Sequence, residues 1–338
     1  MTIILTDPMF HDETAARLYF ESQRWPTGPY CPHCGSTDAC RMEGESHQAG
    51  MCYCRDCGKK FTVTVGTVME RSHIPLAKWA LGFRLMAGSK KGMSAHQLHR
   101  QLGITYKSAW FMAHRIREAM RDENPTPLGG EGKVIEADEA YHGKRETPRE
   151  PQRHDKYRSK PTKKGKSGGA QKRPIVALVE RHGEARVTHM NTVNSKNLRE
   201  FMVKNASRKS KLHTDESGLY PAIGQEFAKH ETVNHSRHEY ARGKGDDLVT
   251  TNWAEGYFGV FKRGMTGIYQ HCGEQHLQRY LDEFTFRYNN RVALGVDDTD
   301  RTAYAVQGAT GKRLTYRGPN SATNAPAVGS GISDLEAR

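Results

Sequence analysis

The stretch T-T-N-W-A-E-G-Y-F-G-V-F-K, residues 250–262, carries the pattern on which the fold assignment rests. Trp253 and Tyr257 are four residues apart, so they share one helical face that can pack against a core. Glu255 and Lys262 are seven residues apart and share a second face. An isolated pair of this kind is most often a solvated ion pair, so its meaning depends on residues elsewhere in the chain.

Two strand-like segments upstream each reach an aspartate. I-E-A-D-E belongs to a predicted strand that ends at Asp138, and K-L-H-T-D is a predicted strand that ends at Asp215. A strand with Asp, a hairpin, a helix, a second strand with Asp and a helix with Glu follow one another as in a ribonuclease H-like α/β domain. Asp138, Asp215 and Glu255 would then meet and hold Mg²⁺ or Mn²⁺, while Lys262 would contact a phosphate or stabilise its developing charge.

Other ionisable residues near these positions receive a plainer interpretation. Glu136 and Glu139 flank Asp138, and alternation along a strand predicts that they point to the opposite face of the sheet. They are therefore expected to be solvated groups or neighbours of the site rather than ligands. His213 and His235 are expected to make structural hydrogen bonds, with orientation of a phosphate or water as the alternative.

The charge of the chain points to a polyanionic partner. The 338 residues contain 51 Lys and Arg against 38 Asp and Glu, a formal charge of +13. Residues 144–173 hold 12 basic and 3 acidic residues, which is +9 of that excess. This basic insertion predicts phosphate contacts, with Lys163, Lys164 and Lys166 as candidates. A solubilising loop is the alternative.

Four of the seven cysteines form two C-x-x-C-G motifs. Two such turns supply the four thiolates of a tetrahedral structural zinc site, and a redox C-x-x-C is the weaker alternative. The expected zinc ligands are Cys31, Cys34, Cys54 and Cys57. The alternating residues 61–65 are predicted to close this ribbon as a strand.

A helical region follows the ribbon. Helices are predicted over residues 76–86, from Ser94 to Leu102, and from Thr105 to Met120, with caps at Ser94 and Thr105 and a turn at Gly103. A helix, a glycine turn and a helix favour a helix-turn-helix that contacts DNA through Arg115 and Arg117, although any helical hairpin can look like this.

The predicted architecture is therefore an α+β multidomain protein with a zinc ribbon, a helix-turn-helix and a ribonuclease H-like α/β catalytic domain. Its N-terminal segment is a helix and lead-in (1–27), in which Asp12 is expected to cap a helix over residues 12–24. The further segments are the zinc ribbon (28–66), the helix-turn-helix region (74–123), the catalytic domain (131–316) with the basic insertion (144–173), and a disordered tail (320–338). No apolar run is long enough for a membrane span and no secretory signal is visible, so a cytoplasmic protein is expected.

Longer motifs resemble one family across nearly the whole chain. They include R-W-P-T-G-P-Y-C-P-H-C-G, S-A-W-F-M-A-H-R-I-R-E-A-M, D-E-A-Y-H-G-K, T-D-E-S-G-L-Y and T-N-W-A-E-G-Y-F-G-V-F-K-R-G. The sequence is similar to the DDE transposases of bacterial insertion sequences that have an N-terminal zinc ribbon and an ISXO2-like catalytic domain. His142 stands where relatives usually have Gly.

The resemblance implies a catalytic triad of Asp138, Asp215 and Glu255, with Lys262 as the basic residue seven positions after the Glu. Asn252 is the alternative third ligand, because some relatives have Asn in place of Glu. The implied activity is metal-dependent cleavage and transfer of DNA strands at terminal inverted repeats, by a homodimer or larger assembly on DNA. A non-catalytic DNA-binding regulator and a nuclease without joining activity are the alternatives.

Overall fold

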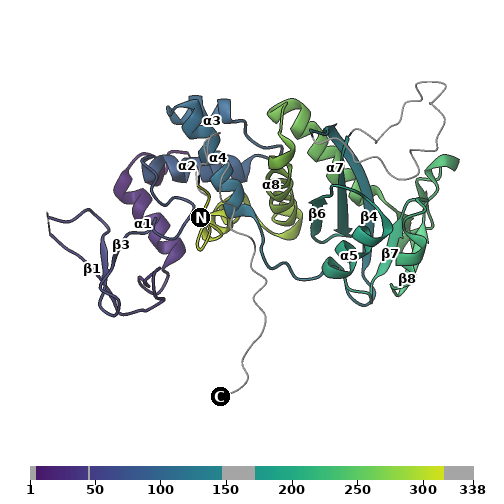
Figure 1. Ribbon diagram of the computed structural model, residues 1–338, viewed down its shortest axis with the longest axis horizontal. Helices are drawn as coiled ribbons and strands as arrows, with labels where there is room; N and C mark the ends of the chain where they lie inside the picture. Colours follow the sequence, from purple (N-terminus) through teal and green to yellow (C-terminus); the bar gives the residue numbers. More distant parts are fainter. Residues whose placement is uncertain (1–4, 45, 147–171, 316–338) are drawn as a thin grey trace, which may run out of the picture.

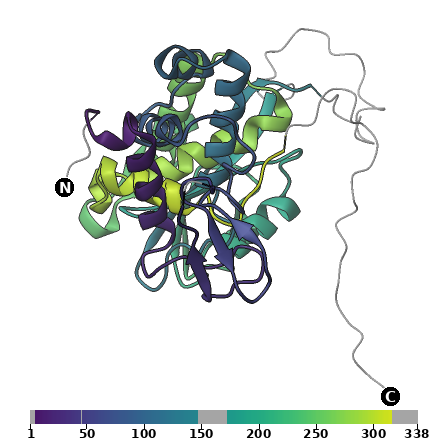
Figure 2. The same ribbon diagram turned by 90° about the vertical axis from the view of Figure 1, so that its left-hand side faces the viewer.

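The computed structural model describes residues 5–44, 46–146 and 172–315. A small three-stranded sheet lies at one end of the long axis and a five-stranded sheet at the other, with a group of helices between them (Figure 1). The view along that axis places the N-terminal elements in front of the five-stranded sheet (Figure 2). None of the helices in the described ranges is both long and apolar enough to cross a membrane.

The N-terminal part begins with a helix that leads into the cysteine ribbon. Asp12 caps helix α1 by accepting a hydrogen bond from Ala15 N at 2.7 Å, which confirms the predicted start of this helix. The elements of this part are η1 (Pro8–Phe10), α1 (Glu13–Arg24), β1 (Ala39–Arg41), β2 (Cys52–Cys54) and β3 (Lys60–Phe61).

The strand predicted over residues 61–65 is wrong beyond Phe61. Val65 N donates to Thr62 O at 3.1 Å, so the chain turns there instead of extending. Arg24 binds the carbonyls of Val63 and Val65 at 2.6 and 2.7 Å, and the Val63 side chain is buried. Tertiary contacts of this turn therefore override the alternating pattern.

The central helices are α2 (Leu76–Gly88), α3 (Ala95–Leu102), α4 (Tyr106–Met120) and α9 (Asp298–Gln307). Ser94 and Gln97 form a complete capping box, and Thr105 caps α4, so both predicted helix starts are confirmed. Gly103 ends α3 in the left-handed region with φ 58°, which is the conformation that favours glycine.

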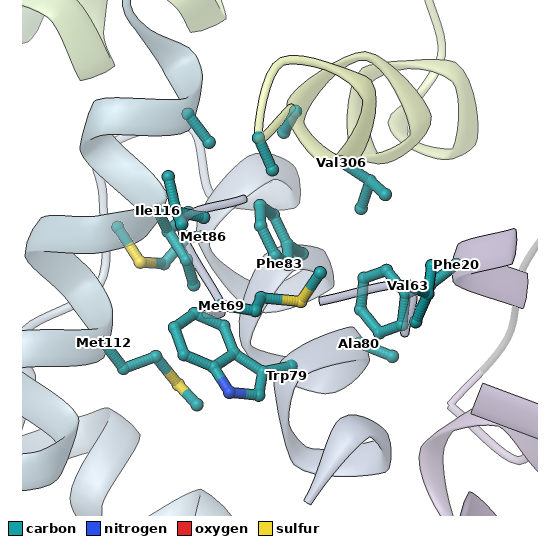
Figure 3. Packing of buried hydrophobic residues seen from close by; sticks show 14 of the residues in the cluster. Phe20, Val63, Met69, Trp79, Ala80, Phe83, Met86, Met112, Ile116 and Val306 are labelled. Atoms are coloured by element: carbon teal, nitrogen blue, oxygen red, sulfur yellow. The ribbon is translucent and has the colours of Figure 1, made fainter. Parts of the chain in front are cut away.

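These helices share one hydrophobic core, called here the N-terminal core. Helix α9 comes from the far end of the sequence, yet it packs against α2 and α4 in this core. Val68 N also donates to Ala309 O at 3.2 Å. Side chains from α1, α2, α4 and α9 that meet there include Phe20, Trp79, Phe83, Met86, Met112, Ile116 and Val306 (Figure 3).

The larger sheet has the strand order β6-β5-β4-β7-β8. Strand β4 pairs antiparallel with β5, and β5 pairs antiparallel with β6, whereas β4, β7 and β8 are parallel. The strands are β4 (Val134–Lys144), β5 (Lys172–Glu180), β6 (Ala185–His189), β7 (Lys211–Thr214) and β8 (Lys229–Thr232). The expected order of strand, hairpin, helix, strand and helix is present, but the predicted end of the first strand at Asp138 is wrong, because β4 stays paired with β5 as far as Lys144.

Helices cover both faces of this sheet and make three layers (Figure 1). On one face α7 and α8 pack on Ile175 and Ala177, and on the other α5 and α6 pack on Val176 and Leu178. The alternation within β5 therefore serves both layers, as expected for a strand buried on both sides. The covering helices are α5 (Ser195–Asn205), α6 (Pro221–Gly224), α7 (Asn252–Gly264) and α8 (Leu277–Asn289).

Shorter elements complete the connections between these strands and helices. A small hairpin of two strands leads into α7, and a π-helical turn extends α7 towards α8. These elements are η3 (His235–Arg237), β9 (Ala241–Arg242), η4 (Gly245–Asp247), β10 (Val249–Thr250), η5 (Met265–Tyr269), η6 (Glu274–His276) and η7 (Val292–Leu294).

A buried ionic network joins the N-terminal core to the layer of α8. Glu283 of α8 is fully buried and accepts from Arg117 Nε at 2.7 Å, from the Tyr269 hydroxyl at 2.6 Å and from Arg287. Arg287 also reaches the carbonyl of Met86 in α2 at 3.4 Å. This acceptor is therefore surrounded by donors, as a buried charge requires.

A neutral histidine lies in the same interface. His114 of α4 is 1% exposed, and neither ring nitrogen has a hydrogen-bond partner among the described residues. Its ring packs beside Trp110, His276 and Tyr280. Burial, followed by the positive charge of Arg117, lowers the pKa of His114 to about 2.

Candidate active site

The four cysteines of the two C-x-x-C-G motifs converge at the base of the small sheet. Cys31 Sγ lies 3.6 Å from Cys57 Sγ, and Cys34 Sγ lies 3.6 Å from Cys54 Sγ. All four sulfur atoms lie within 4.8 Å of one another. Thiolates bound to one tetrahedral zinc ion at about 2.3 Å are separated by roughly 3.8 Å, so the set fits a structural zinc site.

The backbone explains why the cysteines converge. Gly35 N donates to Cys31 O at 2.8 Å, and Gly58 N donates to Cys54 O at 3.0 Å. Both glycines have positive φ, 80° and 67°, which lets each motif close as a tight turn. The other described cysteines, Cys40, Cys52 and Cys272, lie outside this group, as expected.

A second cluster of potential metal ligands lies at the edge of the large sheet. Strands β4 and β7 are parallel, with Glu136 opposite His213. Asp138 and Asp215 each lie two residues beyond that pair, so the two carboxylates emerge at the same level. Carboxylate oxygens of Asp138, Glu139 and Asp215 lie within 4.8 Å of one another.

Glu139 belongs to this cluster although it lies on the opposite face of β4, as alternation predicts, because the pairing of β4 with β5 stays regular across Asp138 and Glu139. Asp138 Oδ1 accepts from the backbone N of Glu139 at 2.7 Å, which turns the Asp138 carboxylate along the strand. In the described sheet, β4 pairs with β7 only as far as Glu136. Beyond that point the side chains at 138 and 139 can both reach Asp215.

Burial and mutual repulsion of the carboxylates determine the electrostatics of the cluster. Burial first, and then the charges of Asp215 and Glu255, raise the pKa of Asp138 to about 6. Burial, followed by the charges of Asp215 and Asp138, raises the pKa of Glu139 to about 7. Crowded oxygen ligands of this kind fit hard divalent cations such as Mg²⁺ and Mn²⁺.

Glu255 lies near the cluster without joining its closest group. It sits in the first turn of α7, its side chain is 47% exposed, and Oε1 lies 3.6 Å from His235 Nε2. Thr251 Oγ1 also lies 3.3 Å from that oxygen. Asp138 and Asp215 are thus brought together at ligand spacing, while Glu255 is close enough for its charge to act on Asp138.

The other predicted residues of α7 are at the surface. Lys262 is exposed in the last turn, with Nζ 5.9 Å from the centre of the Phe258 ring. Asn252 is exposed at the first position of the helix. His142 packs edge-on against Phe261 of the same helix, away from the three clustered carboxylates.

Glu136 has a role that the sequence pattern did not indicate. It is 0% exposed and shares the Asp138 side of β4, so the prediction that it points to the opposite face is wrong, because residues two apart on a strand lie on the same side. Glu136 Oε2 accepts from Trp253 N at 2.8 Å and Ala254 N at 3.3 Å, and Oε1 accepts from Arg181 at 3.1 Å. This buried carboxylate binds the first turn of α7 to β4. It therefore fixes the position of the helix turn that carries Glu255.

The two arginines predicted to contact DNA, Arg115 and Arg117, are both at least partly buried. Arg117 is 2% exposed and bonded to Glu283, so the prediction that it contacts DNA is wrong. Arg115 is half-buried, donates to Glu70 O at 3.1 Å and lies over the Phe111 ring. Lys163, Lys164 and Lys166, most of the basic insertion and the tail 320–338 lie outside the described residues.

Solved structures with some likeness to the chain have low scores. One is a simian T-cell lymphotropic virus intasome in complex with PP2A regulatory subunit B56 gamma, which is 12% identical. The match covers 56% of this chain and 63% of that chain, with a TM-score of 0.28. Another is the Mos1 transposase paired-end complex with left transposon end, with 12% identity, 69% and 80% covered, and a TM-score of 0.27. Scores of this size carry no argument about fold.

The sequence comparisons are more informative. A protein of Halobacterium salinarum described as "Uncharacterized protein in transposable element ISH50" is 25% identical over 280 residues, which cover 82% of this chain and 91% of that protein. The family model of the transposase zinc-ribbon domain matches residues 11–60, and that of the ISXO2-like transposase domain matches residues 127–289. The chain therefore belongs to the family of transposases that carry a zinc ribbon and an ISXO2-like transposase domain.

Proposed function

We propose that this transposase cleaves DNA at the ends of its own element and joins the freed 3′ hydroxyl to target DNA. The observation that carries the proposal is the meeting of Asp138 and Asp215 at the edge of a sheet, with Glu255 close enough to act on Asp138. The strand order β6-β5-β4-β7-β8 supports a ribonuclease H-like catalytic unit.

Asp138, Asp215 and Glu255 are the proposed catalytic carboxylates, and their role is to bind Mg²⁺ or Mn²⁺. The bound cations would activate the attacking oxygen and neutralise charge on the leaving oxygen in each phosphoryl transfer. Lys262 is exposed on the same helix as Glu255 and is proposed to contact a DNA phosphate. One site can serve both steps because both are displacements at phosphorus.

The N-terminal part is proposed to recognise the terminal inverted repeats. The cysteine cluster fits structural zinc, and α3, its glycine turn and α4 support a helix-turn-helix interpretation. Arg115 remains a candidate contact, together with the basic insertion that supplies much of the +13 charge. Two element ends must be held together, so a homodimer or larger assembly on DNA is proposed.

A strand-transfer assay with labelled element ends tests the proposal. The wild-type protein should give both cleaved and joined products with Mg²⁺. Glu255→Gln should abolish both products while end binding stays nearly intact. A variant that still cleaves at the wild-type rate would reject the assignment of Glu255.

The same assay separates the alternatives. A non-catalytic regulator would bind the ends without cleavage, and a nuclease would cleave without a joined product. Cys54→Ser tests the ribbon independently, because it should lower both zinc content and end binding. End binding at full affinity without zinc would contradict the proposed role of the ribbon.

A further inference from the structure

Tyr220 is a buried polar side chain whose hydroxyl has no settled partner. It is 0% exposed, and its hydroxyl lacks a hydrogen bond of normal geometry among the described residues. Burial, followed by the negative charge of Glu139, raises the pKa of this phenol well above its usual value, and Asp138 and Asp215 add to the effect. Tyr220 therefore lies close to the acidic cluster, with Glu139 as its nearest influence.

Glu139 presents the matching feature. Its Oε1 is buried and also lacks a hydrogen-bond partner in the described part of the chain. Tyr220 nevertheless acts on the pKa of Glu139 as a hydrogen-bonding neighbour, so the two groups are adjacent without a well-formed bond. A buried donor and a buried acceptor that lack a good hydrogen bond lower the stability of the fold. A ligand that orients the carboxylate would remove this cost.

We propose that Glu139 is a further metal ligand of the active site and that Tyr220 is the residue that positions it. This inference deepens the proposed function and rests on it. Glu139 would bind the same hard divalent cation as Asp138 and Asp215, and Tyr220 would donate its hydroxyl to the Glu139 carboxylate. Glu255 then completes the site from α7 rather than acting as the third member of the closest group.

Geometry favours Glu139 over Glu255 for this position. Glu139 places a carboxylate oxygen within 4.8 Å of both aspartate oxygens, whereas the Glu255 side chain is 47% exposed and held near His235. Donation from a neighbouring group is how proteins commonly orient a ligand carboxylate. The adjacent Glu216 offers a contrast, because both its oxygens are already bonded to the backbone or side chain of the His235–Ser236 segment.

Binding of Mn²⁺ to the full-length, zinc-loaded protein provides a test that does not depend on catalysis. Electron paramagnetic resonance would measure free Mn²⁺, and calorimetry the affinity. Glu139→Gln should weaken Mn²⁺ binding by about 100-fold and Tyr220→Phe by about 10-fold, within the range known for changes around a metal site. Both variants should keep the zinc content and the melting temperature of the metal-free protein, which a purely structural role would not allow.

Glu200→Gln on the exposed side of α5 is the matched control and should leave Mn²⁺ affinity unchanged. Asp138→Asn distinguishes a failure of the Glu139 assignment from a failure of the proposed metal site. If Asp138→Asn weakens Mn²⁺ binding and Glu139→Gln does not, the role of Glu139 is rejected and the proposed function stands. If Asp138→Asn also binds Mn²⁺ at wild-type affinity, the proposed metal site itself is rejected.

Discussion

A fully buried carboxylate, Glu283, and a partly buried group of three carboxylates have opposite surroundings in this protein. Glu283 is fully buried between Arg117, Arg287 and the Tyr269 hydroxyl. Burial alone would raise its pKa, but the charges of the two arginines outweigh burial and hold the pKa below the usual value. The cluster of Asp138, Glu139 and Asp215 has no ion pair to an arginine or lysine among the described residues.

We propose that the contrast separates a structural charge from a functional one. A compensated carboxylate such as Glu283 holds helices together and is costly to remove. Carboxylates that repel one another without such compensation cost stability, and under the proposed function a bound cation would offset that cost. Replacing Glu283 should therefore lower stability, whereas replacing Asp138 should lower catalytic activity.

The largest expected effect is on catalysis at the uncompensated cluster. Asp138→Asn should lower the rate of strand cleavage in Mg²⁺ by at least about 1,000-fold, or roughly 4 kcal/mol of activation free energy, because a ligand of the proposed cations is lost. The metal-free variant should melt at the wild-type temperature or above it, since one repulsive charge is gone. A clear fall in melting temperature would place Asp138 among the structural carboxylates instead.

The next effect concerns the compensated group. Glu283→Gln should lower the free energy of unfolding by about 3 kcal/mol, because Arg117 and Arg287 would remain buried without their counter-charge. Urea titration followed by circular dichroism measures this change. Glu200→Gln, an exposed change of the same chemistry, should lie within about 0.5 kcal/mol of the wild type. Equal stability of the two variants would show that the network contributes nothing.

Acid should weaken the interface of Glu283 through His114. The native pKa of His114 is lowered to about 2, so below pH 6.5 the unfolded chain binds a proton that the native protein does not. His114 alone should therefore cost about 2 kcal/mol of stability between pH 7 and pH 5. His114→Phe should remove that part of the pH dependence, measured by urea titration at both pH values.

The control for this prediction is an exposed histidine. His271→Gln should leave the pH dependence of stability as in the wild type, since His271 is exposed. If His114→Phe loses stability on acidification as steeply as the wild type, then His114 is not the source of the acid sensitivity.

The smallest effect is expected at the link between the site and its helix. Glu136→Gln should lower the free energy of unfolding by about 1 kcal/mol, because an amide replaces a charged acceptor at the first turn of α7. Hydrogen exchange should show faster exchange of the Trp253 and Ala254 amides. Exchange at the wild-type rate would mean that Glu136 does not hold this turn.

Features set by local geometry could be predicted from the sequence. The caps at Asp12, Ser94 and Thr105 depend on a few neighbouring residues. The convergence of the C-x-x-C-G motifs depends on two tight turns. The meeting of Asp138 with Asp215 followed from one longer-range step, the match of the order of strands and helices to a ribonuclease H-like domain, and the structure brings them together on neighbouring parallel strands.

Features set by distant contacts could not be predicted in the same way. Alternation along β4 did not show that the Glu139 carboxylate reaches Asp215, because the pairing of β4 with β7 ends at Glu136. Arg117 looked like a surface residue, because nothing local shows that Glu283, far along the chain, would cover it. Helix α9 was not predicted, although its Asp297 cap is a local signal.

The return of α9 to the N-terminal core has a consequence for how the chain is made. Val306 and Ala309 are buried beside residues of α2 and α4. During synthesis, this core therefore stays unfinished until the ribosome has passed residue 309, after the sheet with the acidic cluster has emerged. A nascent chain would complete the half proposed to hold DNA only after the half proposed to cut it, and truncation before α9 should leave the first half open.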